Sequence, residues 1–282
     1  MNQVVIVTDS TAYLSQSILE ELNIQVIPLS VIWDGESYKD GVEITPAEFY
    51  TRLTVSDNLP STSQPPAAAF KDCFNALLGQ GKDVVAILIS SGISGTVNSA
   101  LQAQQDIKSD RIAVVDSKTA AMATGLHVLA AARKAAQGAS LKEVTEIAEK
   151  AQKHTEVVFA VDTLEFLHKG GRIGGAKRLL GSMLNIKPIL EMKDGLIEPV
   201  DQVRTQKKAL ERLISLVQEK SGDVRPLRLS VFHSNVPENA QALLDDAKNI
   251  LSPDETFLNE LSPVIGTHVG PGTLAIAFMY GM

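Results

Sequence analysis

The chain has 282 residues but only one cysteine, Cys73, so no disulfide can form within it. The lack of an internal disulfide favours a reducing compartment, and we expect a cytoplasmic protein. No apolar run approaches the roughly 18 residues that indicate a membrane span. The N-terminal run MNQVVIVTDS has no positively charged start, unlike a signal peptide. The net charge of -7 argues against a nucleic-acid partner, which usually meets a basic face.

Signatures of metal binding, cofactor binding and catalysis are also missing. The five histidines show no HExxH spacing and have no cysteine partners, so the sequence does not support a metal site. No GxGxxG occurs, and Gly170–Lys177 lacks the Gly-Lys-Ser/Thr ending of a phosphate loop because Ala176 precedes the lysine. Ser94 lies in GISGT rather than GxSxG, which does not support a nucleophile elbow. We therefore predict no cofactor, no metal and no catalytic residue.

One segment differs in charge from the acidic chain around it. Phe166–Leu190, FLHKGGRIGGAKRLLGSMLNIKPIL, contains no Asp or Glu. Its basic residues are Lys169, Arg172, Lys177, Arg178 and Lys187. A basic, glycine-rich segment in an acidic protein indicates a surface that meets an anion.

The first half of the chain alternates short runs rich in Val and Ile with helix-like stretches. The expected strands are Val4–Val7, Val26–Val31, Val84–Ile89 and Ile112–Val115. The expected helices are Ser15–Leu22, Pro46–Leu53, Pro65–Leu78, Ser94–Ile107 and Thr119–Gln137. This alternation predicts a parallel sheet with helices on both faces.

The second half mixes hairpins with helices, which indicates an α+β arrangement. Lys187–Met192 and Leu196–Val203 are predicted to pair across Lys193-Asp194-Gly195, because Asp-Gly tolerates the positive φ of a tight turn. The other expected elements are strands at Val157–Val161, Leu227–Phe232 and Thr273–Met279 and helices at Thr205–Glu219 and Pro237–Leu251. We place a domain boundary near Thr155, giving an α/β domain over residues 1–155 and an α+β domain over 156–282.

Three loops of small residues are candidates for ligand binding. They are Leu59–Pro66 (LPSTSQPP), Ser90–Thr96 (SSGISGT) and Gly266–Gly272 (GTHVGPG). The first two precede predicted helices, whose free N–H groups and dipole favour an anion. Ser90–Thr96 also follows a predicted parallel strand, where ligands commonly bind. Helix capping alone would equally explain Thr62 and Ser94, and His268 would fit a purely structural role.

Six motifs, in this order along the chain, resemble those of the DegV family. They are TDS after the first strand, STSQP, SSGISGT, VVDSKTA, FLHKGGRIG and HVGPGT. The resemblance covers essentially the whole chain. It implies a parallel α/β/α sandwich followed by a domain with a mixed sheet, with one long-chain fatty acid in a tunnel between them. It also implies the role of the fatty-acid-binding subunit of bacterial fatty acid kinase, in which an ATP-dependent partner phosphorylates the bound carboxylate for phospholipid synthesis.

The resemblance also implies which residues meet the carboxylate. Thr62 and Ser94 match the family's carboxylate-binding hydroxyls, and His268 matches the histidine near the head group. With a reference pKa of about 6.5, His268 could donate a hydrogen bond or carry a charge beside the anion. Further expected donors are Ser63 and the backbone N–H groups of Gly95 and Thr96.

Arg172 matches the family arginine near the tunnel mouth, and we expect it, with Lys169, to meet the partner kinase or a phosphate. Arginine suits that role because its guanidinium binds phosphate oxygens in pairs. The apolar residues near these loops are candidates for the tunnel wall: Ile93, Phe166, Leu167, Leu179, Met183, Leu184 and Ile265.

Three functional hypotheses remain open. The first is a carrier, not an enzyme, that presents a long-chain fatty acid to a kinase subunit; an acyltransferase and a transient membrane surface would be its further partners. The second is an enzyme with Ser94 as nucleophile and His268 as base for acyl or phosphoryl transfer. The third is a phosphotransferase that acts through His268.

Overall fold

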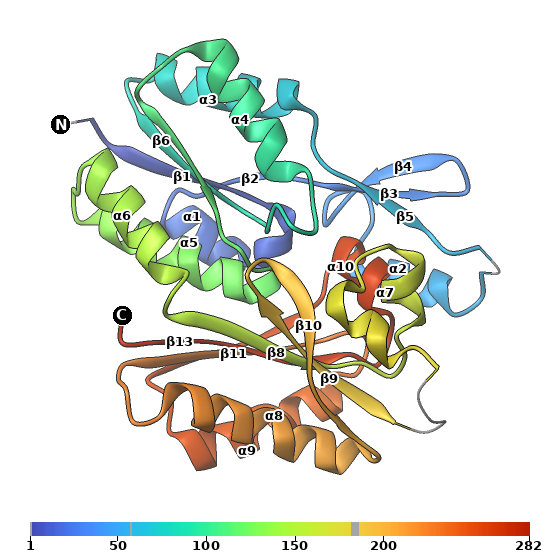
Figure 1. The fold of residues 1–282 in the computed structure, drawn as a ribbon. Coiled ribbons are helices and arrows are strands. Elements are labelled where there is room, and N and C mark those ends of the chain that lie inside the picture. The colour runs from blue at the N-terminus through green and yellow to red at the C-terminus, as the bar shows by residue number, and fades with distance from the viewer. Residues whose placement is uncertain (1, 57, 182–185) are drawn as a thin grey trace.

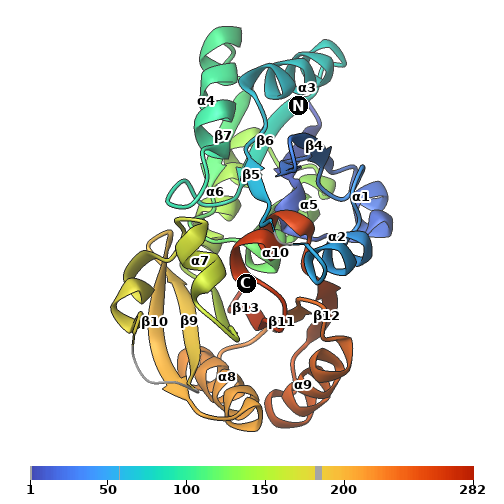
Figure 2. The same ribbon diagram turned by 90° about the vertical axis from the view of Figure 1, so that its right-hand side faces the viewer.

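The computed structural model describes residues 2–56, 58–181 and 186–282, in which the strands form three sheets. Figure 1 shows the two larger sheets stacked, with helices between and outside them, and the small sheet to one side. Figure 2 shows the same layers from the side of the small sheet. No helix in the described parts of the chain is both long enough and apolar enough to span a membrane.

A parallel sheet of four strands forms the core of the first half. Its strand order is β2 (Gln25–Ile27), β1 (Val4–Asp9), β6 (Asp83–Leu88) and β7 (Ile112–Asp116). One face packs against α3 (Ala67–Gly79) and α4 (Thr96–Ile107), and the other packs against α1 (Gln16–Glu21), α5 (Ala121–Ala136) and α6 (Leu141–Ala151). Successive residues of β1 face opposite helix layers, which explains why all of Val4–Val7 are apolar.

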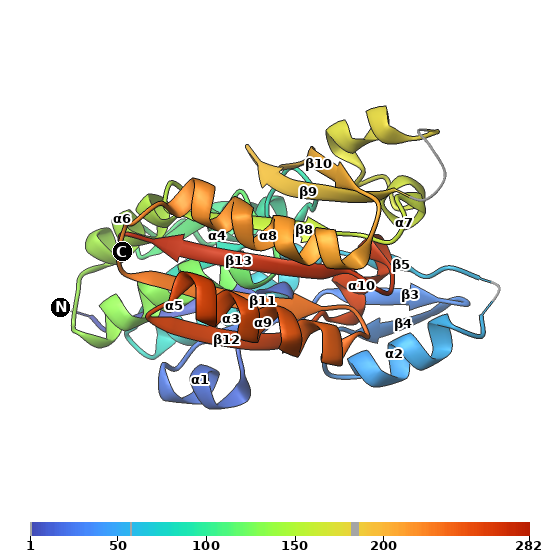
Figure 3. The ribbon, with the colours of Figure 1, turned by 90° about the horizontal axis from the view of Figure 1, so that it is seen from below.

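A mixed sheet of six strands forms the core of the second half. Its order is β10 (Leu196–Val203), β9 (Lys187–Lys193), β8 (Thr155–Ala160), β13 (Leu274–Tyr280), β11 (Leu227–His233) and β12 (Glu255–Glu260). Only β11 and β12 pair in parallel among these described strands. Helices α8 (Gln206–Ser221) and α9 (Pro237–Leu251) cover the outer face (Figure 3), while the inner face packs against α5.

A small sheet of three strands joins the N-terminal part to the C-terminal part. It is formed by β4 (Glu36–Lys39), β3 (Ser30–Trp33) and β5 (Ser61–Ser63), and its core includes α2 (Pro46–Leu53) and Val264 of α10 (Pro263–Val269). The buried Asp40 carboxylate accepts hydrogen bonds from Ser10 Oγ (2.7 Å), Ser262 Oγ (2.8 Å) and Val264 N (3.2 Å). Burial raises the pKa of Asp40 to about 6, although these bonds oppose that shift. Asp40 thereby holds the start of α10 against the small sheet.

The predicted fold class is confirmed, because a parallel sheet precedes a mixed one. The prediction of one strand over Val26–Val31 is wrong: β2 and β3 belong to different sheets, and Pro28, which has no N–H to donate, lies between them. Two of the three segments predicted as loops include regular structure: Leu59–Pro66 contains the strand β5, and Gly266–Gly272 contains the end of α10. β8 starts at Thr155, but the division into two domains stays a prediction.

Several elements did not stand out in the sequence. They are α6, β4, β12, α10, the short helix α7 (Glu165–Lys169) and the 3-10 turns η1 (Ser10–Ala12) and η2 (Gly174–Leu179). Ser140 and Glu143 form a capping box at the start of α6, a signal that the sequence did contain. The segment Val31–Glu43, with the buried Trp33, includes the β3–β4 hairpin.

Candidate functional site

A largely apolar cavity lies between the parallel-sheet half and the inner face of the mixed sheet. The space within it, open solvent at its mouth included, amounts to about 1040 Å³. Ile89 and Ala121 line it from one side, and Val157, Phe159 and Ala275 line it from the other. Its polar lining includes Thr62, Ser63, Gln64, Ser94, Arg172 and His268, which we call the polar end.

His268, on the last turn of α10, contacts the strand β5 across the polar end. Its Nε2 lies 2.8 Å from Thr62 Oγ1, and either atom can donate in this bond. The Nδ1 atom is buried and has no hydrogen-bond partner among the described residues. Burial, with a smaller effect from the charge of Arg172, lowers the pKa of His268 to about 4. The histidine is therefore neutral at pH 7 and acts as a donor or acceptor rather than as a fixed charge.

The Ser90–Thr96 loop brings Ser94 to the cavity at the start of α4. Ser94 Oγ lies 2.8 Å from Thr96 Oγ1, and Gly95 is the N-cap residue, without a side-chain cap. Gln64 crosses to this loop and donates from Nε2 to the carbonyl oxygen of Gly95 (3.2 Å). The sequence reasoning did not single out Gln64, although it lies in the STSQP motif. The amide therefore fixes the distance between two of the predicted ligand-binding loops.

Arg172 lines both the cavity and a shallow surface groove beside the Ser90–Thr96 loop. Its guanidinium donates to two backbone carbonyls, from Nε to Ile93 O (3.0 Å) and from Nη1 to Gly170 O (2.7 Å). None of the ion pairs of the described residues joins it to a carboxylate. Lys169, by contrast, pairs with Glu165 at 2.6 Å. Arg172 thus offers a positive charge to an anion at the boundary between cavity and surface.

Ser94 and His268 are not joined by a hydrogen bond among the described contacts. His268 bonds to Thr62, and Ser94 bonds to Thr96. A serine nucleophile needs a base within hydrogen-bond reach, so this arrangement does not favour the hypothesis of acyl or phosphoryl transfer by Ser94 and His268. The described residues also contain no group of three His, Cys, Asp or Glu side chains that could hold a metal ion.

Of the residues predicted to form the tunnel wall, the structure places some in the lining of the cavity and others outside it. Ile93, Leu167 and Ile265 line the cavity. Phe166 packs instead against Gly270, where a Cβ atom would collide with its ring, and Leu179 packs against the neighbouring core. Met183 and Leu184 lie outside the described residues. The wall also includes residues that the sequence did not indicate: Leu29, Ile89, Ala120, Ala121, Val157, Phe159, Met192, Ile197, Phe232, Leu261, Val264, Val269, Thr273 and Ala275.

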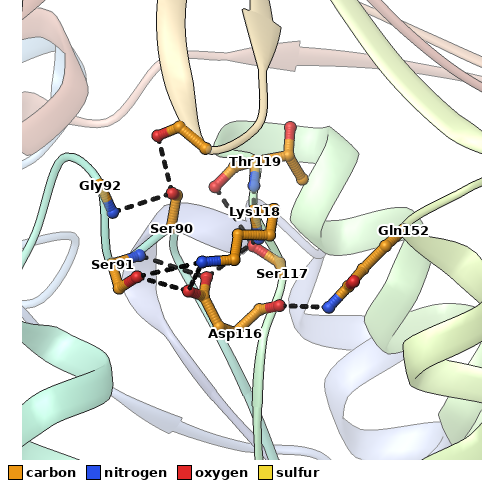
Figure 4. Close-up of polar contacts among 9 residues, drawn as sticks. Ser90, Ser91, Gly92, Asp116, Ser117, Lys118, Thr119 and Gln152 are labelled. Carbon is orange, nitrogen blue, oxygen red and sulfur yellow. Dashed lines mark hydrogen bonds and ion pairs between the residues drawn. The ribbon is translucent and has the colours of Figure 1, made fainter.

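The tip of the β9–β10 hairpin docks on the Ser90–Thr96 loop (Figure 4). Ser90 Oγ donates to the carbonyl oxygen of Gly195 (2.8 Å) and accepts from Gly92 N (3.1 Å). The Asp116 carboxylate accepts hydrogen bonds from N and Oγ of Ser91, the residue after Ser90. It also forms an ion pair with Lys118 Nζ at 2.8 Å. The hairpin therefore supports the loop that carries Ser94.

Gly92→Ala is expected to disturb this docking, because its Cβ would collide with the carbonyl oxygen of Gly195. We expect a loss of roughly 1–3 kcal/mol in the free energy of unfolding, as for other overpacked sites. Urea unfolding measures it. Gly79→Ala is the control, since a Cβ at Gly79 meets nothing within 4 Å and its φ is not in the left-handed region. Equal stability of the two variants would contradict the close approach.

Comparison with known proteins gives a consistent picture. The family model described as an uncharacterised protein of the DegV family matches residues 3–281. A DegV domain-containing protein of Halalkalibacterium halodurans is 37% identical over 279 residues, covering 99% of each chain. A solved structure of a DegV family protein from Thermus thermophilus, described by its fatty acid binding, is 35% identical with a TM-score of 0.94 and covers 99% of each chain. DegV of Bacillus subtilis, described as a fatty acid binding protein, is 34% identical with a TM-score of 0.90, covering 99% of this chain and 100% of that one.

Proposed function

The chain belongs to the DegV family, and on that premise we propose that it binds a long-chain fatty acid in the apolar cavity. The carboxylate would lie at the polar end, within reach of Thr62, Ser94 and His268. The observation that carries this proposal is the combination of an apolar cavity with the neutral Thr62–His268 pair at its polar end. The family members from Thermus thermophilus and Bacillus subtilis, described as binding fatty acids, support it.

The two parts of such a ligand make different contributions to binding. Burial of an acyl chain gives about 0.8 kcal/mol per methylene, so roughly fifteen carbons give on the order of 10 kcal/mol before ordering costs. A carboxylate removed from water needs several hydrogen-bond donors to offset its lost hydration. The acyl chain therefore supplies most of the affinity, and the polar end sets the orientation in which the lipid binds.

We further propose that the protein presents this carboxylate to an ATP-dependent kinase subunit, which converts it to an acyl phosphate for phospholipid synthesis. Arg172 would contact the phosphate or the partner, because it lies between the cavity and the surface groove. Lys169 is likewise proposed to meet the phosphate or the partner, and Ser63 and the backbone N–H groups of Gly95 and Thr96 are proposed as further donors to the carboxylate. The protein would act as a carrier without catalysis of its own; an acyltransferase and a membrane surface would then be later partners.

Mass spectrometry of the purified protein tests the lipid-binding proposal. An excess mass under native conditions that disappears on denaturation and equals that of a fatty acid is the expected result. Delipidated protein should take up palmitic acid in the same assay. Failure of the delipidated protein to bind any of a series of saturated and unsaturated long-chain acids would refute the proposal.

Arg172→Ala is expected to separate binding from phosphorylation. Fatty acid retention should stay within about threefold of wild type, because Arg172 is proposed to contact the phosphate or the partner rather than the carboxylate, and the burial of the acyl chain is unchanged. Phosphorylation by a purified bacterial fatty acid kinase subunit should fall by about a hundredfold, as when one preorganised charge donor is removed. Arg178→Ala, a change to an exposed base in the same basic segment, is the control. A loss of lipid retention in Arg172→Ala would instead assign this arginine to the binding of the carboxylate.

A further inference from the structure

Gln64, the residue after β5, connects the strand that carries Thr62 to the start of α4. Its Nε2 atom donates to the carbonyl oxygen of Gly95 (3.2 Å) and to Ser99 Oγ (3.2 Å). Ser99 is 7% exposed, and its backbone N–H donates to the same carbonyl oxygen of Gly95 (3.1 Å). The amide of Gln64 is therefore bound to the first turn of α4, immediately after Ser94.

This side chain supplies a connection that the backbone beside it does not make. Among the described residues, Gln64 forms both hydrogen bonds that join residues 59–66 to residues 90–99. The two residues that follow it are prolines, which have no N–H group to donate. The strand before it is paired on another side, where Thr62 lies opposite Val31 of β3. The spacing of the two segments therefore depends on one amide group.

The same amide packs directly on Gly95. A Cβ atom at Gly95 would lie 2.1 Å from Gln64 Oε1 and 2.4 Å from Nε2, which is too close for atoms that are not bonded. The φ angle of Gly95 is -82°, outside the left-handed region, so its backbone conformation does not by itself require glycine. The glutamine of STSQP and the second glycine of SSGISGT therefore fit each other across the polar end.

Gln64 lines the cavity but offers no free donor to a carboxylate. The carbonyl oxygen of Gly95 can only accept, so the nitrogen of the amide has to face it. The two N–H groups of that nitrogen are used by Gly95 and Ser99. The other amide atom, Oε1, is an acceptor like the carboxylate itself. Gln64 is thus suited to hold other donors in place rather than to bind the ligand.

We propose that Gln64 is a positioning residue that makes the polar end selective for a carboxylate, by holding the Thr62 and Ser94 hydroxyls where both donate to one head group. This inference rests on the proposed function, because it concerns the same ligand. Thr62 lies two residues before Gln64. Ser94 lies directly before Gly95, so a shift of the amide contact changes the distance between the two hydroxyls. A neutral head group gains less from paired donors than a carboxylate does, so the lost spacing weakens mainly the acid.

Isothermal titration of delipidated Gln64→Met with palmitic acid and with its methyl ester tests the inference. Methionine has nearly the length of glutamine but no N–H group. We expect the acid to bind about tenfold more weakly than to wild type and the ester to change by less than about threefold. Gln104→Met is the matched control, because Gln104, on α4, also donates from its amide to a backbone carbonyl, Ile112 O (2.7 Å). It should leave the ratio of the two affinities unchanged. An equal loss for acid and ester in Gln64→Met, or no loss for the acid, would overturn the positioning role.

Gly95→Ala disturbs the same contact from the other side, because its Cβ displaces the amide of Gln64. It should weaken palmitic acid to a similar extent as Gln64→Met. In the double variant Gly95→Ala/Gln64→Ala the collision is relieved, so the loss should equal that of Gln64→Ala alone. Gly79→Ala, where a Cβ meets nothing within 4 Å, is the control. Losses that add in the double variant would show that Gly95 acts independently of Gln64 and would overturn the inference.

A second pair of variants tests whether Gln64 acts through Ser94. Once Ser94→Ala has removed one of the two hydroxyls, Gln64→Met should weaken palmitic acid by less than about threefold more. A full tenfold further loss would contradict the inference. Failure of the wild type to bind palmitic acid would instead refute the proposed function, and this inference with it.

Discussion

A double variant, Thr62→Val with Ser94→Ala, should lose fatty acid affinity by at least about a hundredfold. Each replaced hydroxyl is a proposed donor to the carboxylate, and a hydrogen bond to a charged group contributes roughly 1.5–3 kcal/mol. The Thr62→Val change also leaves His268 Nε2 without its 2.8 Å partner. Native mass spectrometry of the protein, followed by titration with palmitic acid, measures the loss.

Ser61→Ala is a matched control for this double variant. Ser61 lies on the same short strand, β5, but is exposed and does not line the cavity. Palmitic acid methyl ester gives a second readout, because it lacks the charge that the two hydroxyls are proposed to stabilise. The double variant should weaken the acid much more than the ester. An unchanged affinity for the acid would show that neither hydroxyl binds the carboxylate.

The largest effect of pH on stability is expected at His127, on α5. This histidine is fully buried, and neither ring nitrogen has a hydrogen-bond partner among the described residues. Burial lowers the pKa of His127 to about 3, well below its unfolded value near 6.5. The unfolded chain therefore binds a proton more readily than the folded one. The stability that the neutral histidine contributes is complete above pH 6.5 and is lost as the pH falls toward 3.

His127→Leu removes this titration. Between pH 7 and pH 5 the free energy of unfolding of the wild type should fall by about 2 kcal/mol relative to that of the variant. Urea unfolding of both proteins at the two pH values measures the difference. The wild type must be compared with the variant because Asp40, whose pKa is raised, adds stability to both proteins as the pH falls below about 6. Measured on the wild type alone, that gain would mask part of the loss due to His127. His168→Leu, on the exposed face of α7, is the control; parallel pH curves for wild type and His127→Leu would contradict the prediction.

The sequence motifs pointed to the polar end because its residues have a distinctive chemistry. Thr62, Ser94 and His268 lie in short loops of small and polar residues, and the structure places all three around one cavity. Their role in binding stays a prediction. The 2.8 Å contact between Thr62 and His268 joins residues 206 positions apart, a pairing that follows from the docking of α10 on the small sheet rather than from any local pattern.

Most residues of the apolar cavity wall could not be predicted from the sequence. Val157 lines the cavity, while its neighbour Val158 packs under the opposite face of the same sheet, and the two residues are chemically identical. Met192 and Ile197 reach the wall because the hairpin predicted at Asp194-Gly195 pairs them directly, but the sequence does not show which hairpin face is inward. Composition predicts burial, and only the assembled layers decide which buried residue borders a cavity.

The central place of β13 has a consequence for synthesis on the ribosome. This strand comes last among the described elements, yet it lies between β8 and β11 in the middle of the six-stranded sheet. While a nascent chain lacks it, β8 and β11 have no shared neighbour, and the floor of the cavity at Ala275 does not exist. Capture of the proposed lipid would therefore have to wait until residue Tyr280 has left the exit tunnel, and nascent chains that stall earlier would expose the edges of β8 and β11 to chaperones.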